Sequence, residues 1–208
     1  MKRFLILLIG LLTAIAPLSA ANAGKKNGNG KPNVRLEWGL TAAAYYNIFK
    51  IDDAKNISVK SPMSVGAGLH MSLNFGRFFA IQPEINYQYQ KFNVRTDKAQ
   101  KNIKVTGHSV DIPILLSLRI ANVVRFNAGP MFTVMNSYHY DNDRGERVMY
   151  GNARPTFGYS AGVAVLLRRR FMIDARYTGY FKQSLNHVEG EEFNGQLSSI
   201  SLKLGFLF

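Results

Sequence analysis

His70, Ser72 and Glu84 are the residues of this sequence whose types could perform catalysis together. A histidine can act as general base on a serine nucleophile while a carboxylate orients the histidine, which is the arrangement used in acyl transfer. His70 and Ser72 are two residues apart, and in a strand that spacing separates their Cβ atoms by about 7 Å. Direct activation of the serine is then awkward. We therefore interpret His70 as a hydrogen-bonded interior histidine and predict no catalytic residue, with an outer-membrane lipid-modifying enzyme as the alternative.

The other residue types that carry chemistry give no site. His108, His139 and His187 fall in separate segments between the predicted strands, without the close spacing of metal ligands. The sequence contains no Cys, which excludes disulfides, thiolate metal sites and cysteine nucleophiles. We predict neither a metal ion nor a cofactor.

The elements that position these residues are strands. In 63–75, the apolar residues Met, Val, Ala, Leu, Met, Leu and Phe occupy every odd position, and small or polar residues lie between them. Period-two alternation gives a strand one apolar face. Eight spans carry this pattern: 34–44, 63–75, 79–89, 110–120, 124–134, 157–167, 171–181 and 198–208.

The connections between these spans alternate between short and long. They contain 18, 3, 20, 3, 22, 3 and 16 residues. Each span is about as long as a tilted strand that crosses a bilayer, which needs roughly 9 to 11 residues. Outer-membrane barrels have short turns on the periplasmic side and long loops outside. The sequence therefore predicts an all-β fold, an eight-stranded antiparallel up-and-down transmembrane β-barrel.

Charge placement favours a lipid-facing apolar surface. A charge that faces lipid near the bilayer midplane costs about 2 to 4 kcal/mol, and aromatic residues gather at both ends of the spans, as in interfacial girdles. The alternative is a soluble lipocalin-like ligand-binding barrel, in which the apolar face would line a cavity. The spans contain nine charged residues, all on the face opposite the apolar one: Arg35, Glu37, Glu84, Asp111, Arg119, Arg125, Asp174, Arg176 and Lys203.

The N-terminal residues have the composition of a cleaved signal peptide. Lys2 and Arg3 precede an apolar run, and Ala-Asn-Ala at 21–23 is a small-residue cleavage site. We predict a signal peptide at 1–23, a flexible periplasmic tail at 24–33 and the barrel domain at 34–208. A signal peptide followed by a barrel predicts location in the bacterial outer membrane.

Four stretches carry a family resemblance: FFAIQPEINYQYQK (78–91), HSVDIPILLSLRI (108–120), VVRFNAGPMF (123–132) and FGYSAGVAVLLRRRFMIDARYTGYF (157–181). They resemble the PorT-like outer-membrane β-barrel family of Bacteroidetes. The resemblance implies the fold and a place in a Gram-negative cell envelope. It also implies a link to the system that secretes proteins across the Bacteroidetes outer membrane.

The formal charge of +13 is scattered along the chain, without a basic stripe that has stacking aromatics between its charges. We therefore predict no nucleic-acid partner. The expected partners are outer-membrane lipids, lipopolysaccharide, and other envelope or secretion proteins. The segment 90–109 holds five basic residues that are candidates for charge-assisted hydrogen bonds to lipopolysaccharide phosphates: Lys91, Arg95, Lys98, Lys101 and Lys104.

The interior of the predicted barrel must be filled. Eight strands enclose a lumen only wide enough for side chains, which excludes a large diffusion pore, and charges taken from water must pair. The predicted function is therefore a small, non-enzymatic barrel with a filled lumen that acts through loops and partners. The resemblance to the PorT-like family implies that it acts as an accessory of Bacteroidetes protein secretion. We predict a lumen ion-pair cluster of Glu37, Glu84, Asp174, Arg176 and Lys203.

Overall fold

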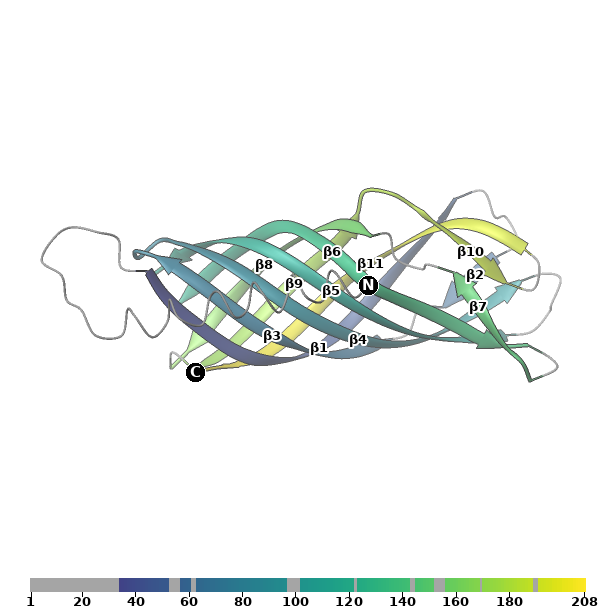
Figure 1. Cartoon of the computed structure of the whole chain (residues 1–208), viewed down its shortest axis with the longest axis horizontal. Helices are drawn as coiled ribbons and strands as arrows, with labels where there is room; N and C mark the ends of the chain where they lie inside the picture. The colour runs from purple at the N-terminus through teal and green to yellow at the C-terminus, as the bar shows by residue number, and fades with distance from the viewer. Residues whose placement is uncertain are drawn as a thin grey trace, which may run out of the picture.

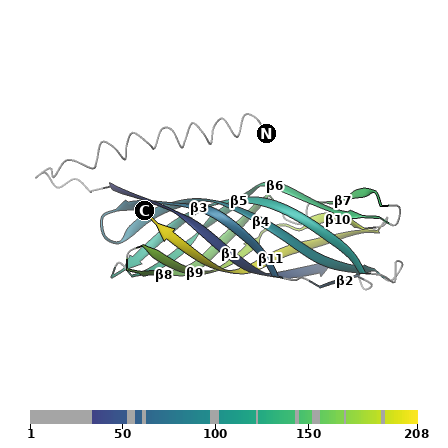
Figure 2. The same cartoon turned by 90° about the horizontal axis from the view of Figure 1, so that it is seen from below.

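The alternating spans fold into antiparallel strands that close into a barrel, shown in Figures 1 and 2 of this computed structural model. Eight long strands form a ring in which each pairs with the next of the eight along the chain, and the pairing of β1 with β11 completes the ring. The predicted eight-stranded antiparallel barrel is confirmed. The ring consists of β1 (Val34–Asp52), β3 (Met63–Phe75), β4 (Phe79–Thr96), β5 (Asn102–Ile120), β6 (Val124–Asp141), β8 (Phe157–Leu167), β9 (Phe171–Tyr180) and β11 (Glu191–Leu207).

The described part of the chain starts at Val34, so the signal peptide and tail predicted for 1–33 lie outside it. No helix in this part is long and apolar enough to cross a membrane. The structure describes residues 34–52, 57–60, 63–96, 102–121, 123–142, 145–151, 156–168, 170–188 and 191–208.

The three short connections are tight turns of one kind. The first residue of each has a positive φ: Gly76 (67°), Ala121 (51°) and Arg168 (50°). The latter two turns are closed by hydrogen bonds from Val123 N to Ile120 O (3.1 Å) and from Arg170 N to Leu167 O (3.2 Å). Turns this tight connect antiparallel neighbours directly, which gives the barrel its up-and-down order.

The apolar face of every ring strand points outward. Leu69, Leu116 and Leu204 are 43%, 59% and 58% exposed, while the polar face fills the lumen. A soluble protein would leave this continuous apolar band in water at a large free-energy cost. The lipocalin-like alternative, with an apolar interior, is therefore wrong. Of the aromatic residues at the long-loop ends, Tyr46, Tyr87 and Phe181 face outward as girdle residues do.

The long connections are not simple loops. β4, β5, β6, β1 and β11 continue beyond the predicted spans and form a β-sheet extension at the long-loop end (Figure 1). A β-bulge in β6 shifts the register here, because Thr133 pairs with Asp111 and Met135 pairs with Val110, leaving Val134 as an extra residue. Three short strands join the extension: β2 (Ile57–Lys60) pairs with β4, β7 (Arg147–Gly151) pairs with β6 and β10, and β10 (Ser184–Val188) also pairs with β11.

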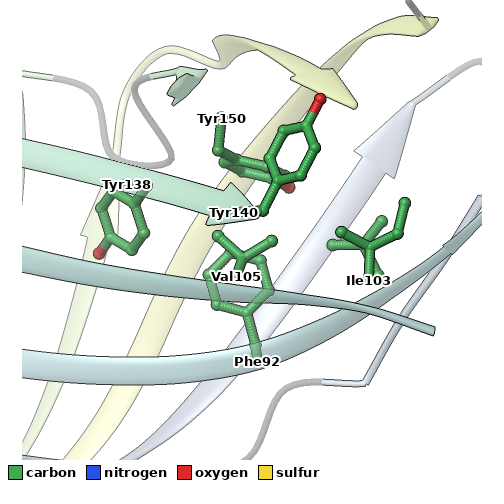
Figure 3. Close-up of a cluster of buried hydrophobic side chains, with 7 residues drawn as sticks. Phe92, Ile103, Val105, Tyr138, Tyr140 and Tyr150 are labelled. Atoms are coloured by element: carbon green, nitrogen blue, oxygen red, sulfur yellow. The ribbon is translucent and has the colours of Figure 1, made fainter. Parts of the chain in front are cut away.

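The extension has a core of its own, which we call the apolar cap (Figure 3). Phe92 packs edge-on to Tyr150 with ring centroids 5.3 Å apart, and Tyr138 lies against Gly107 of β5, where a Cβ would clash with its ring. Burial, together with the neighbouring Tyr138, raises the pKa of Tyr150. The cap consists of Phe92, Val94, Ile103, Val105, Tyr138, Tyr140 and Tyr150.

The cap reverses the polarity of the barrel below it. On β4, inward residues change from Gln88 and Gln90 to Phe92, while outward residues change from Tyr89 to Lys91. Polar outside and apolar inside is the arrangement of a protein in water. The membrane-spanning part of β4 therefore ends near Tyr89, and the extension lies outside the lipid.

Candidate functional site

A central ion-pair cluster occupies the lumen, and Glu84 of β4 lies at its centre. Arg176 of β9 donates to both carboxylate oxygens of Glu84, from Nη1 at 2.8 Å and from Nη2 at 3.1 Å. Lys203 of β11 donates to Glu84 Oε2 at 3.0 Å. Asp174, two residues before Arg176, accepts a further bond from Arg176 Nη2. All four side chains are buried, so two carboxylates and two cations balance one another across the barrel.

Glu37 belongs to a second cluster nearer the short turns. Arg125 Nη2 of β6 donates to Glu37 Oε2 at 2.8 Å, and Arg119 Nη2 of β5 lies 3.7 Å from Glu37 Oε1. Arg119 also donates to Asn74 Oδ1 at 2.5 Å. Arg125 is fully buried and Arg119 nearly so. Charged side chains therefore fill the lumen in two separate layers.

The five residues predicted as one cluster thus divide between the two layers. The structure brings Glu84, Asp174, Arg176 and Lys203 together, but it places Glu37 with Arg119 and Arg125. Both arginines lie on the polar, inward face of their strands in the alternating sequence pattern. That position is the signal from which they could have been predicted as members of the cluster. The stagger of the strands decides which inward residues meet, and alternation alone does not reveal it.

Polar residues continue the filling between and above the clusters. A small cavity next to the central cluster is lined by Asn86, Asp111 and Ser160, among others. In the described part of the lumen, both polar atoms of the Gln82 side chain and Nε2 of His70 are buried without a protein partner. Buried groups of this kind are usually hydrogen-bonded, so these atoms belong to the unsatisfied part of an otherwise paired polar interior.

The catalytic alternative has no supporting geometry in the lumen. His70 Nδ1 lies 3.3 Å from Glu84 Oε1, which is already shared with Arg176. The hydroxyl of Ser72 instead donates to Asn74 Oδ1 at 3.1 Å. Both His70 and Ser72 are buried behind the barrel wall. A serine that donates away from the histidine, far from the lipid, is not poised as a nucleophile.

His70→Ala is expected to leave the lipid composition of the outer membrane unchanged and to lower the free energy of unfolding by about 1 to 3 kcal/mol, because a buried partner of Glu84 is removed. Mass spectrometry of extracted lipids and urea unfolding in detergent would measure the two effects. Ser72→Ala is the matched control. Loss of an acylated lipid in either variant, with the barrel still folded, would contradict a structural role.

Three of the five basic residues predicted to contact lipopolysaccharide are described, and they lie on the outside of the extension. Lys91 and Arg95 of β4 and Lys104 of β5 are exposed, beyond the end of the lipid-facing band. Lys98 and Lys101 lie outside the described residues. Across the described ranges, no group of three or more His, Asp and Glu side chains could hold a metal ion.

Comparison with known proteins agrees with this geometry. A family model for the outer membrane protein beta-barrel domain matches residues 22–188, and no curated protein matches the sequence. Among solved structures, the chain is similar to Ail, the attachment invasion locus protein of Yersinia pestis in complex with the heparin analogue sucrose octasulfate. The TM-score is 0.54 and the identity 14%, over 83% of this chain and 99% of that one.

A second similar structure is Neisserial surface protein A (NspA), with a TM-score of 0.52 and 12% identity over 81% of this chain and 96% of that one. At these identities the likeness concerns the fold. The family model covers most of the chain, including seven of the eight ring strands. The protein therefore belongs to the outer membrane protein beta-barrel domain family and is a small β-barrel of the bacterial outer membrane.

Proposed function

We propose that this protein is a non-enzymatic barrel with a closed lumen, and that its extension is the part that meets partners. The observation that carries the proposal is that two charged layers cross the lumen. In the central layer, Arg176, Glu84 and Lys203 join strands β9, β4 and β11 across the interior. A lumen closed by such bonds has no open passage for large solutes. The ordered surface available to other molecules is then the extension with its apolar cap.

The wild-type protein is expected to show little steady conductance in planar bilayers, because the two charged layers would have to break for ions to pass. A diffusion porin inserted into the same bilayers is the positive control. The matched variant is Glu37→Gln with Glu84→Gln, which removes the central acceptor of each layer and should increase the frequency of brief openings. A large steady current through the wild-type protein would overturn the closed lumen.

The partner that we propose is a component of Bacteroidetes protein secretion, on the basis of the resemblance of 78–91, 108–120, 123–132 and 157–181 to PorT-like proteins. An extension with its own core supports this role, because it offers a partner a surface that is already ordered. Flexible loops would instead lose conformational entropy on binding. Cross-linking through Lys104 in intact cells, followed by mass spectrometry, would test it. Recovery of secretion components supports the proposal. The proposal is contradicted if no secretion component is recovered with this protein from cells in which the secretion components still cross-link to one another.

Contact with lipopolysaccharide is the second part of the proposal. Lys91, Arg95 and Lys104 project from adjacent strands at increasing distance beyond the lipid-facing band, with Lys91 nearest to it. They would meet phosphates of the outer-leaflet lipid and its core sugars, because charge-assisted hydrogen bonds to lysine and arginine are the strong kind. Such contacts would hold the extension at a fixed height and rotation relative to the membrane surface.

A further inference from the structure

Two histidines that the function above does not use lie on the outer face of the extension. His108 of β5 is the cross-strand partner of Tyr89 on one side and of Ser137 on the other. His139 of β6 faces the same way, because the bulge at Val134 reverses the parity of β6 beyond it. Their ring centroids are 6.4 Å apart and the rings are nearly parallel. Both side chains are half-buried, so each presents one side to solvent.

Aromatic contacts fix His108 in place. The hydroxyl of Tyr87 lies 2.5 Å from His108 Nδ1, and the ring of Tyr89 lies 5.1 Å from the imidazole. When Tyr87 donates to Nδ1, the neutral imidazole carries its proton on Nε2 and can donate it to a ligand. Tyr87 and Tyr89 are the last lipid-facing aromatic residues of β4. His108 therefore lies at the edge of the lipid-facing band, and His139 lies just beyond it.

Cations surround the pair on neighbouring strands. The ammonium of Lys91 lies over the ring of Tyr89, 5.3 Å from its centroid, and Lys91 and His139 both pair with Thr106, one from each side. On the side of the histidine pair away from Lys91, Arg147 of β7 is exposed and is the cross-strand partner of Asp141 of β6. Asp141 is the acidic group among them. The patch therefore has an excess of positive charge and of N–H donors.

We propose that His108, His139, Lys91 and Arg147 form a proton-linked binding site for a phosphate group of lipopolysaccharide. This inference rests on the lipopolysaccharide contact proposed above and adds one residue type, histidine, and two strands, β6 and β7, to it. A phosphate accepts several hydrogen bonds at once, and the four residues supply donors from β4, β5, β6 and β7 around one patch. The position beside Tyr89 and just beyond it, at the edge of the lipid-facing band, matches a lipid-borne phosphate.

The direction of the proton linkage follows from the neighbours of His139. Partial burial and the positive charges of Arg147 and His108 lower the pKa of His139, and Asp141 opposes them. A bound phosphate adds negative charge beside the imidazole and raises this pKa again. Binding therefore takes up a proton. Affinity should rise as the pH falls toward the pKa of the free site, by up to tenfold for each unit by which binding raises the pKa.

The test uses the full-length protein in nanodiscs of zwitterionic lipid. Its affinity is measured between about pH 5.5 and about pH 8, the range in which a histidine titrates. The three probes are deep-rough lipopolysaccharide, the same lipid after enzymatic removal of its phosphates, and inorganic phosphate. The wild-type protein should bind the phosphorylated lipid roughly tenfold more tightly at the acidic end. The dephosphorylated lipid and inorganic phosphate should bind weakly throughout.

His139→Gln is the decisive variant, because lipid phosphates themselves lose charge near pH 6 and act against the predicted trend. This variant should match the wild-type affinity at about pH 8 and lose the gain at low pH. Lys91→Gln with Arg147→Gln should weaken binding at every pH. Arg170→Gln, an exposed cation in a short turn at the opposite end, should leave binding unchanged.

The outcomes separate the two proposals. Binding that needs Lys91 but shows the same pH dependence in wild type and His139→Gln would overturn the proton-linked site and leave the lipopolysaccharide contact standing. Absence of binding at every pH would overturn both. Full competition by inorganic phosphate at similar concentrations would overturn the assignment to a lipid.

Discussion

Arg176→Ala is expected to lower the free energy of unfolding of the barrel by about 3 to 5 kcal/mol, the usual cost of leaving buried charge without its partner. Arg176 donates to both oxygens of Glu84 and also to Asp174. Once it is removed, Lys203 is the one remaining lysine or arginine of the central cluster, and it faces two buried carboxylates. Urea unfolding of the protein in detergent micelles, followed by tryptophan fluorescence of Trp38, would measure the loss.

Two further variants identify the cause of that loss. Glu84→Gln with Arg176→Met removes charge of both signs and should be milder than Arg176→Ala, because fewer uncompensated charges remain. Arg170→Ala, in an exposed turn, should change stability little. A double variant as unstable as Arg176→Ala would show that packing rather than charge pairing makes Arg176 important.

Phe92→Ala is expected to destabilise the extension by about 3 to 5 kcal/mol, the cost of emptying a large aromatic site in a core. Phe92 is 1% exposed and packs on Tyr150, Tyr138 and Phe49, with ring centroids 5.3, 6.0 and 6.1 Å away. The cap lies above the lipid-facing band, so its loss should open the extension and leave the membrane barrel folded. Limited proteolysis of the long-loop end, combined with gel mobility before and after boiling, would separate the two.

Lys91→Ala is the matched control, since the neighbouring side chain on β4 points outward. It should leave both protease resistance and gel mobility unchanged. If Phe92→Ala abolishes the heat-dependent mobility of the whole protein, the extension and the barrel form one cooperative unit rather than two.

The sequence predicts the membrane-spanning strands well because alternation and lipid contact impose the same period. It does not predict the extension, although a signal was present. On β4 the alternation runs on past Tyr89 with its polarity reversed, from Gln90 inside to Phe92 inside and from Tyr89 outside to Lys91 outside. A span defined by one apolar face therefore ends at Tyr89, where this reversal begins, and the rest of β4 is missed. The bulge at Val134 adds a change of parity that no pattern of period two contains.

The sequence predicts which side chains point into the lumen, but it does not predict which of them contact one another. Parity alone identifies Glu37, Arg119 and Arg125 as inward residues, and the structure confirms this direction. Their meeting depends on the relative heights of β1, β5 and β6, which follow from strand tilt and stagger. For the same reason Glu37 cannot be separated from Glu84 in the sequence, although the two lie in different layers.

The seam between β1 and β11 has a consequence for the order of assembly. Trp38 stacks on Phe208 with ring centroids 4.5 Å apart, and Trp38 O accepts a hydrogen bond from Phe208 N at 2.8 Å. Hairpins such as β3–β4 and β8–β9 need only three-residue turns and can pair early. The seam joins strands from opposite ends of the barrel sequence, so the loop that must close is the longest and its entropic cost the highest. A barrel without this pairing would leave both edges open to other chains, so we expect damage to the seam to favour aggregation more than damage to a hairpin turn.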